Sequence, residues 1–250
     1  MGNASTTWIG LSGYSYKPWQ GEGRFYPVGL KQTEFLGFYA ERYRAVEMDG
    51  TWYRMPSEKA VQEWNDKSPE IFRFSFKLHR QITHMSRLKL DSLESVTFML
   101  KRLGPLAAAG KLGPLLIQLP PNMKRNDDRL GQFLANLPVA IEGVQSLPRP
   151  LEWAVEFRHD SWNVTEVENI MRSHAVAWVA ADTDETAAQR RDTGVSHYAR
   201  LRRSDYSNEA LQEWTRYFRG TEKECYVYCK HEDEGAPWIW ADALASFQNA

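Results

Sequence analysis

Apolar and polar residues follow two different periods along the chain. In FRFSFKLH (72–79), four apolar side chains alternate strictly with four polar ones. This period of two residues is typical of a β-strand, because successive side chains of a strand point to opposite faces. Seven more short runs are strand-like by this alternation or by their apolar content. They cover residues 8–14, 45–53, 112–120, 151–158, 175–182, 196–202 and 225–231.

Segments with the helical period of about 3.6 residues separate most of these strands. They cover residues 33–43, 57–67, 91–109, 127–137, 163–173, 207–219 and 236–248. Strands that alternate with helices indicate parallel βαβ units. An open doubly wound sheet is one arrangement of such units, but no glycine-rich phosphate motif follows the first strand.

The length of the chain favours a closed barrel, which typically takes about 250 residues. We therefore predict an α/β fold, a closed TIM-like (β/α) barrel, formed by a single domain over residues 1–250. Residues 1–7 are expected to form a flexible tail.

The charged face of FRFSFKLH has a predicted direction in such a barrel. Helices cover the outer face of the strands, so the phenylalanines are expected to pack outward while Lys77 and His79 point inward. Both lie at the carboxyl end of the strand, where barrel enzymes carry their active sites. The other strands end in polar side chains that can face the same mouth. These are Ser12, Glu47, Asp49, Gln118, Glu156, Arg158, Asp182, Arg200, Arg202, Tyr228 and Lys230.

This set of side chains suggests acid–base chemistry on an anionic substrate. A carboxylate beside another carboxylate has a raised pKa and one beside arginine a lowered pKa, so one site can hold an acid and a base. We predict Glu47 and Glu156 as this pair, with Asp182 and His79 as further catalytic candidates. Arginine and lysine would bind the anion. The predicted substrate contacts are Tyr14, Trp19, Asp49, Tyr53, Arg54, Lys77, His84, Gln118, Arg158, His159, Trp162, Arg200, Arg202, Tyr228 and Lys230.

Three classes of function stay open. The first is an enzyme with hydrolytic or acid–base chemistry on a phosphorylated or otherwise anionic small molecule or nucleic-acid fragment. The second is a non-catalytic protein that stacks single-stranded nucleic acid on loop aromatics, although the net charge of −1 gives no basic surplus. The third is a barrel kept for protein interactions. A structural reading also stays open, in which the charges only satisfy one another and the aromatics plug the mouth.

A divalent metal is a weaker prediction. Glu47, Asp49, His79, Glu156 and Asp182 are of the residue types that bind Mg²⁺, Mn²⁺ or Zn²⁺. However, the sequence has no HxH or HExxH spacing, and the cations expected at the same mouth would repel the ion. We therefore favour a site without a metal and leave the cofactor unassigned.

The two cysteines, Cys225 and Cys229, fall on one face of a single predicted strand, about 13 Å apart. This distance excludes a disulfide between them and favours buried thiols in a reducing compartment. The sequence shows neither a secretion-signal pattern nor an apolar run long enough to cross a membrane. We predict a cytoplasmic protein with no membrane partner, and its oligomeric state stays open.

Blocks of sequence along the chain carry a resemblance to a known family. They are WIGLSGYSYKPWQGEGRFYP (8–27), AVEMDGTWYRMPS (45–57), FRFSFKLHRQITH (72–84), LGPLLIQLPPN (112–122), AVEFRHDSW (154–162), YARLR (198–202), YSNEALQEW (206–214) and CYVYCKHEDEGAPW (225–238). In this order they resemble the domain-of-unknown-function 72 family (DUF72), also called the YecE-like family. The resemblance extends from Trp8 to about Ala243 and so covers nearly the whole chain. It implies a closed α/β barrel related to the TIM architecture, and it implies no particular activity.

The chain departs from the family pattern at the expected mouth. The resemblance implies Glu then Asn in the second strand, where this chain has Glu47 and Asp49. It implies Arg-Leu-His-Gly where residues 200–203 read Arg-Leu-Arg-Arg, and two asparagines where Lys230 and His231 stand. An amide-rich mouth has thus become more charged, which predicts a different ligand or the loss of the ancestral one.

Overall fold

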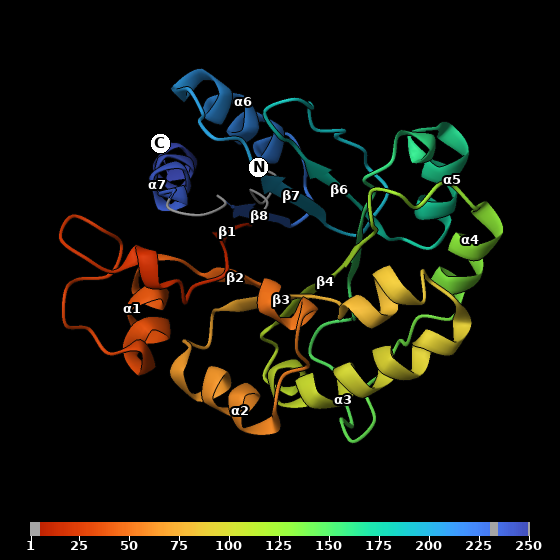
Figure 1. Cartoon of the computed structure of the whole chain (residues 1–250), viewed down its shortest axis with the longest axis horizontal. Coiled ribbons are helices and arrows are strands. Elements are labelled where there is room, and N and C mark those ends of the chain that lie inside the picture. Colours follow the sequence, from red (N-terminus) through yellow and green to blue (C-terminus); the bar gives the residue numbers. More distant parts are fainter. Residues whose placement is uncertain (1–5, 231–234, 250) are drawn as a thin grey trace.

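The strands of this protein close into a barrel. The computed structural model describes residues 6–230 and 235–249. Within these residues, eight parallel strands pair in chain order and the last pairs with the first (Figure 1). The strands are β1 (Thr7–Ser12), β2 (Ala45–Met48), β3 (Arg73–Lys77), β4 (Leu112–Gln118), β5 (Trp153–Glu156), β6 (Ala177–Ala181), β7 (His197–Leu201) and β8 (Cys225–Cys229). The predicted closed barrel is confirmed. His231, at the end of the predicted eighth strand, and residues 1–5 of the predicted tail lie outside the described residues.

Seven α-helices among the described residues surround the barrel (Figure 1). They are α1 (Phe35–Arg42), α2 (Glu58–Lys67), α3 (Leu93–Ala108), α4 (Asp127–Ala135), α5 (Thr165–Ser173), α6 (Asn208–Arg219) and α7 (Pro237–Asn249). Each predicted helix is found at its expected place. Ser57 and Ser207 cap α2 and α6, because their hydroxyls accept hydrogen bonds of 3.2 Å from the amides of Ala60 and Ala210. No helix in the described part of the chain has the length and apolar content to cross a membrane.

The run 45–53 does not form one strand as predicted. β2 ends at Met48, and Asp49–Trp52 forms a short 3₁₀ helix. The Thr51 hydroxyl lies 2.7 Å from the carbonyl oxygens of both Met48 and Lys77, so it fastens this turn to the end of β3. The prediction that Asp49 continues the strand beside Glu47 is therefore wrong, and Asp49 lies at the rim.

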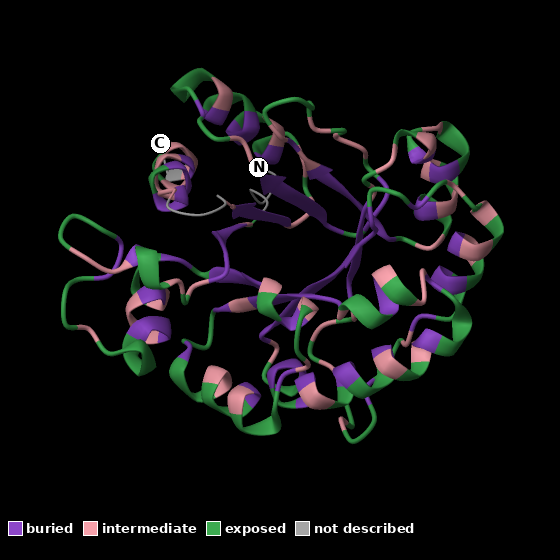
Figure 2. Cartoon of the chain, in the orientation of Figure 1, coloured by how far each residue is buried: buried purple, intermediate pink, exposed green. Residues whose placement is uncertain are grey.

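The main apolar core lies between the strands and the helices. Phe72, Phe74 and Phe76 are buried in it, and the Trp64 indole of α2 packs 6.5 Å from the Phe74 ring and 5.8 Å from the Phe76 ring. Figure 2 shows buried residues along the strands and on the barrel-facing sides of the helices. The outward direction predicted for the apolar face of FRFSFKLH is confirmed.

A second, smaller core fills the barrel. Its members are Trp8, Ala45, Leu116, Ala154, Ala177, Val179, Tyr198, Tyr226 and Tyr228. Tyr228 donates a hydrogen bond of 2.8 Å to Ser75 Oγ of β3, which ties two opposite strands together across the interior. The barrel is thus packed through its middle, as is usual for this fold, and only its two ends can hold a site.

The junction of β1 and β2 contains a side chain from outside the sheet. The Tyr39 hydroxyl of α1 accepts a hydrogen bond from the Leu11 amide (2.8 Å) and donates one to the Ala45 carbonyl (2.7 Å). Gly10 lies at the same place, and a Cβ atom on it would come within 1.9 Å of the Ala45 carbonyl oxygen and 3.0 Å of the Tyr39 hydroxyl. The close approach of β1 and β2 therefore requires glycine at position 10.

We expect Gly10→Ala to lower the free energy of unfolding by about 3 kcal/mol or more, because the added methyl group overlaps a backbone carbonyl. The matched control is Gly37→Ala, within α1, where a Cβ atom meets nothing within 4 Å. This change should instead stabilise by about 0.5–1 kcal/mol, since alanine favours a helix. Urea unfolding of both variants measures the difference, and similar small effects would contradict the close approach.

Candidate functional site

The carboxyl-terminal mouth of the barrel is organised around one buried arginine. Arg200 of β7, which is 1% exposed, lies between Glu47 of β2 and Glu156 of β5. Its Nη2 donates to Glu47 Oε1 at 2.8 Å and its Nη1 donates to Glu156 Oε2 at 2.6 Å. Three strands that are distant in sequence are thus joined through a single guanidinium.

Each carboxylate has further donors. Glu47 accepts hydrogen bonds from Ser12 Oγ (2.5 Å) and Tyr198 Oη (2.7 Å). For Glu156, the donor is Gln118 Nε2, which lies 2.9 Å from both carboxylate oxygens, and Arg202 Nη1 is 3.8 Å away. Buried carboxylates are tolerated only when they are paired and hydrogen-bonded in this way.

These contacts keep both carboxylates ionised. Burial alone would raise the pKa of each group, but the charge of Arg200 and the hydrogen bonds outweigh it. The pKa of Glu47 is lowered, and that of Glu156 falls to about 2. Neither group holds a proton at neutral pH, so the geometry does not favour them as an acid–base pair.

Lys77 of β3 has a pKa that is lowered toward neutral pH. It is 9% exposed, and its Nζ lies 4.9 Å from the centre of the Trp52 ring. Burial, the charge of Arg200 and the charge of Lys230 lower the pKa of Lys77 to about 8, although Glu156 and Glu47 act in the opposite direction. A lysine in this state is partly neutral at physiological pH.

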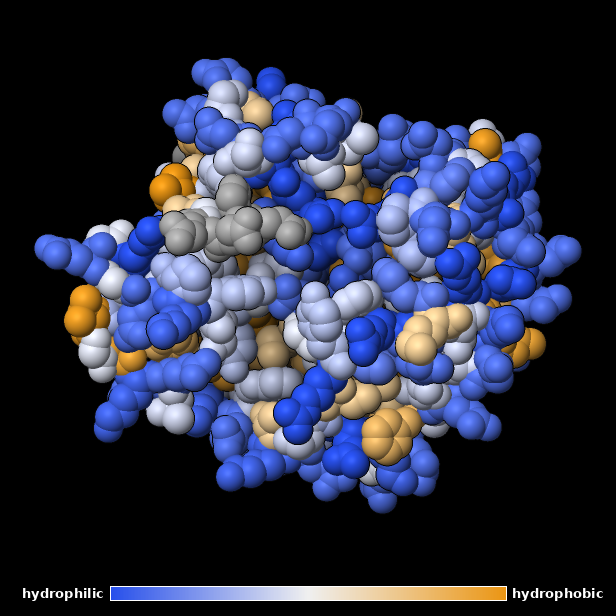
Figure 3. Space-filling view, in the orientation of Figure 1, coloured by the Kyte–Doolittle hydropathy of each residue, from blue (hydrophilic) through white to orange (hydrophobic). Residues whose placement is uncertain are grey.

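A cavity of about 440 Å³ opens beside this network at the ends of β5 and β6. Its charged lining comes from Glu156, Arg158, His159, Asp160 and Arg202. Apolar lining comes from residues such as Phe157, Trp178 and Val179, and the polar stretch 183–189 supplies its rim. Figure 3 looks onto this mouth and shows hydrophilic side chains gathered over the centre of the barrel.

Several of the predicted site residues do not line the cavity. Asp182 is buried and accepts hydrogen bonds from the Tyr206 hydroxyl and the Arg202 amide (3.0 Å), with Arg203 3.2 Å away. It therefore fastens the segment after β7, and burial raises its pKa.

Two tryptophans and one tyrosine have structural partners. Trp162 is fully buried and donates to the Met123 carbonyl at 2.7 Å. Trp19 is buried against Phe25 and Trp238, with ring centres 6.1 and 5.6 Å away. Tyr228 lies in the packed interior.

The remaining predicted residues lie around the rim. Tyr14 accepts a hydrogen bond from the Trp64 indole (3.1 Å), and Asp49 accepts one from the Tyr16 hydroxyl (2.7 Å). Arg54 and Tyr53 are exposed, the latter by 69%.

The rim histidines are each held by a donor. His79 Nδ1 accepts from the Gln81 amide (3.2 Å), and His159 Nδ1 accepts from the Ser161 amide (3.1 Å). His84 Nδ1 accepts from the Trp52 indole at 3.3 Å, and burial together with Lys77 lowers its pKa.

Tyr198 and Trp178 belong to this site but were not among the predicted residues. Tyr198 is two residues before Arg200 and therefore faces the interior, so strand alternation could have identified it. Trp178 of β6 also lines the cavity, and the alternation of side chains along the strand does not indicate this position. Within residues 6–230 and 235–249, no group of three or more His, Cys, Asp or Glu side chains could hold a metal ion.

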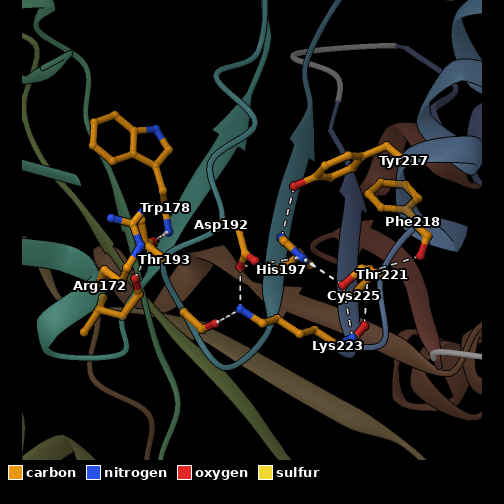
Figure 4. A network of polar contacts seen from close by, with 12 residues as sticks. Arg172, Trp178, Asp192, Thr193, His197, Tyr217, Phe218, Thr221, Lys223 and Cys225 are labelled. Carbon is orange, nitrogen blue, oxygen red and sulfur yellow. Dashed lines mark hydrogen bonds and ion pairs between the residues drawn. The ribbon is translucent and has the colours of Figure 1, made fainter. Parts of the chain in front are cut away.

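The opposite end of the barrel carries a polar network that is internally satisfied (Figure 4). His197, at the start of β7, lies 3.0 Å from the Tyr217 hydroxyl and 3.2 Å from the Thr221 hydroxyl. Asp192 is ion-paired with Lys223 beside it. Both ring nitrogens of His197 have partners, so we interpret this network as structural. The carboxyl-terminal mouth is the better candidate site.

The fold and the mouth define a TIM-type α/β barrel with a charged cavity at the carboxyl ends of its strands. The chain matches the family described as "Protein of unknown function DUF72" over residues 8–249, and it belongs to this family. The UPF0759 protein YecE of Escherichia coli K12 is 31% identical over 153 residues, which are 61% of this chain. The match spans 48% of that relative, so this chain corresponds to about half of its length.

Solved structures show the same architecture. A DUF72 family protein from Thermotoga maritima has a TM-score of 0.79 and 24% identity, with 98% of this chain and 100% of that chain covered. The endoglucanase Cel5A of Pseudomonas stutzeri has a TM-score of 0.53 and 10% identity, with 99% and 96% covered. Both likenesses are evidence of fold alone. The predicted family is confirmed, and the fold is one that also carries enzymes.

Glu156 gives the stability of the protein a predictable dependence on pH. Its pKa is about 2 in the folded protein and is 4.5 without these contacts, so the unfolded chain binds a proton first as the pH falls. The stabilisation is therefore complete above about pH 5 and is lost toward pH 2. Between about pH 6 and about pH 3, the free energy of unfolding should fall by about 2 kcal/mol because of Glu156 alone. We expect this part of the fall to be absent in Glu156→Gln when urea unfolding is measured over the same range.

The control for this experiment is Glu63→Gln, on the exposed surface of α2, where the carboxylate lies 3.8 Å from Lys67. Its pH profile should match that of the unmodified protein, since exposed pairs contribute little. A Glu156→Gln profile as steep as that of the control would contradict the lowered pKa.

Proposed function

We propose that this protein is a barrel enzyme whose substrate is a small anionic molecule, bound in the cavity between the ends of β5 and β6. The observation that carries this proposal is the lining of the cavity, where the guanidinium groups of Arg158 and Arg202 lie with two carboxylates, Glu156 and Asp160. Glu156 is already neutralised by Arg200. The cationic side chains are consequently in excess for an incoming phosphate or carboxylate group.

Arg158 is the best placed residue to bind that group. It is exposed at the cavity, and no carboxylate among the described residues lies within ion-pair distance of it. A guanidinium can make two parallel hydrogen bonds to a phosphate or carboxylate. The apolar wall formed by Trp178 and Val179 would contact the uncharged part of the substrate.

The class of reaction follows from which groups can change protonation. Glu47 and Glu156 stay ionised because of Arg200, so we assign them the role of positioning that arginine. Lys77, with a pKa of about 8, is a buried group that can exchange a proton near neutrality. We therefore favour acid–base chemistry on an anionic substrate, with hydrolysis of a phosphate ester as one form of it.

Single-stranded nucleic acid is the alternative ligand. Tyr53 is 69% exposed, and its ring centre lies 4.5 Å from that of Trp52. Two exposed arginines are close by, since Arg54 follows in sequence and Arg80 lies 6.0 Å from the Trp52 ring. Exposed aromatic rings beside cations are typical of surfaces on which bases stack. Neither the two aromatic residues nor the two arginines line the cavity, so the two ligands can be told apart by mutation.

The cysteines bear on the compartment. Cys225 and Cys229 are both free and buried. Free buried thiols fit a reducing environment, and we propose the cytoplasm on this basis.

Binding of inorganic phosphate and of phosphate monoesters tests the proposed function. We expect saturable binding that quenches or shifts tryptophan fluorescence, because Trp178 lines the cavity. Arg158→Ala should weaken this binding about tenfold or more, since a hydrogen bond to a charged group contributes about 1.5–3 kcal/mol. The same ligands, tested for turnover with and without Mn²⁺, show whether binding leads to reaction.

Arg172→Ala is the matched control, because Arg172 is an exposed arginine of α5 that pairs with Glu168 outside the cavity. It should leave phosphate binding unchanged. Equal binding by the Arg158 and Arg172 variants would remove the cavity from the proposal. Binding of oligonucleotides that falls steeply with salt and is lost in Tyr53→Ala would favour the alternative ligand.

A further inference from the structure

Lys77 differs from the other buried lysine of the barrel in having no hydrogen-bond acceptor. Lys111 donates from Nζ to the Asn65 carbonyl (2.6 Å), the Ser68 carbonyl (2.9 Å) and the Ser68 hydroxyl (3.1 Å). Around Lys77 Nζ, no acceptor or carboxylate within the described residues lies at bonding distance, and the centre of the Trp52 ring lies 4.9 Å away. The side chain is largely buried, but its Nζ is not among the sealed polar atoms of the described residues, so water at the mouth can bond to it and an incoming ligand can replace that water.

The two carboxylates that could neutralise Lys77 are already occupied. Glu47 and Glu156 both bind Arg200, and Glu156 also binds Gln118. The other charged groups that act on Lys77 are Arg200 and Lys230, and both are cations. His84 also lies close enough for its charge to interact with Lys77 and with Arg158.

The position of Lys77 also suits a reactive group. It is the last residue of β3 and points into the mouth, where the strand ends of the barrel converge. The turn that follows β2 covers it, because Thr51 bonds the Lys77 carbonyl and Trp52 lies over Nζ. Glu156, whose charge acts on Lys77, also lines the cavity, and this carboxylate connects the amine to the proposed substrate site.

We propose that Lys77 is the nucleophile of a covalent site, and that its amine forms an imine with the carbonyl carbon of a small oxo compound that also carries an anionic group. This inference rests on the proposed function for the anionic group and adds the aldehyde or ketone. A lysine among other cations, desolvated against an aromatic ring, is the arrangement that keeps an amine nucleophilic.

The step balances without any oxidant or reductant. The nitrogen lone pair of neutral Lys77 forms a bond to the carbonyl carbon, and the electron pair of the C=O bond moves to oxygen, which takes up a proton. The nitrogen then loses a proton, the oxygen leaves as water after a second protonation, and the C=N bond forms. Neutral Lys77, the carbonyl compound and one proton thus give one protonated imine and one water molecule, and solvent at the open mouth carries the protons.

The lowered pKa makes the step feasible near neutrality. At about 8, the pKa of Lys77 leaves a larger neutral fraction than that of an ordinary lysine. The protonated imine that results keeps the positive charge that Lys77 had. The electrostatics set by Glu47, Glu156 and Arg200 are therefore unchanged by the reaction.

Reductive trapping with pyridoxal 5′-phosphate tests the proposal, because this probe carries both an aldehyde and a phosphate. The full chain is incubated with the probe and cyanoborohydride, digested, and mapped by mass spectrometry. We expect Lys77 to be labelled about tenfold faster than the exposed Lys59 at neutral pH. Its rate should rise with a midpoint near pH 8, and inorganic phosphate should slow it.

Two variants support the assignment. Lys77→Arg keeps the charge but forms no imine, so it should remove the label while preserving the fold and phosphate binding. Lys59→Arg, on the exposed face of α2, should leave labelling of Lys77 unchanged. Labelling of Lys77 no faster than that of Lys59, or with the same pH midpoint, would overturn the proposal.

The outcomes also separate this inference from the proposed function. If phosphate binds in an Arg158-dependent manner but Lys77 is not labelled first, the anion site stands and the covalent step is wrong. If Lys77 is labelled first by both pyridoxal 5′-phosphate and a neutral aldehyde such as butanal, and phosphate does not slow either, the covalent step stands and the anion site fails.

Discussion

The bridge from Arg200 to Glu47 and Glu156 is the interaction on which the rest of the mouth depends. Without the guanidinium, Glu47 would lose its ion-pair partner and Glu156 would keep only Arg202, 3.8 Å away, a state that costs several kcal/mol. With it, both are ionised and neither is available to neutralise Lys77. Arg200 thus keeps Glu47 and Glu156 ionised and paired, and it leaves Lys77 without a carboxylate partner.

The same bridge separates the barrel into parts with different tasks. Below it, tyrosines and small apolar side chains fill the interior and make it rigid. Above it, the side chains are cationic and partly open to solvent, and the cavity lies beside them. At the amino-terminal end, both ring nitrogens of His197 are bonded to hydroxyl groups. We therefore place the candidate chemistry at the carboxyl-terminal mouth.

Much of this arrangement is readable from the sequence, because side chains of a strand alternate. Alternation correctly turns Lys77, Glu156 and Arg200 inward and the phenylalanines of β3 outward. Asp182 shows the limit of this reasoning, since it ends the run of β6 but lies out of step with Val179, which faces the interior. A terminal polar residue is therefore informative only together with the parity of its strand.

Other features cannot be obtained from the pattern. Trp19 and Trp162 lie in short 3₁₀ helices of the connecting segments, where apolar and polar residues do not alternate regularly. Their burial depends on how these segments fold back onto the barrel. Distances across the barrel, between residues far apart in the chain, determine that one arginine bridges two carboxylates and that Lys77 has no acceptor among the described residues.

The pairing of β1 with β8 has a consequence for synthesis on the ribosome. Glu47 emerges long before its partner Arg200, 153 residues later, and β1 waits for β8. Until β8 is made, the sheet of the nascent chain has two open edges, so the barrel can close only after this strand has been synthesised.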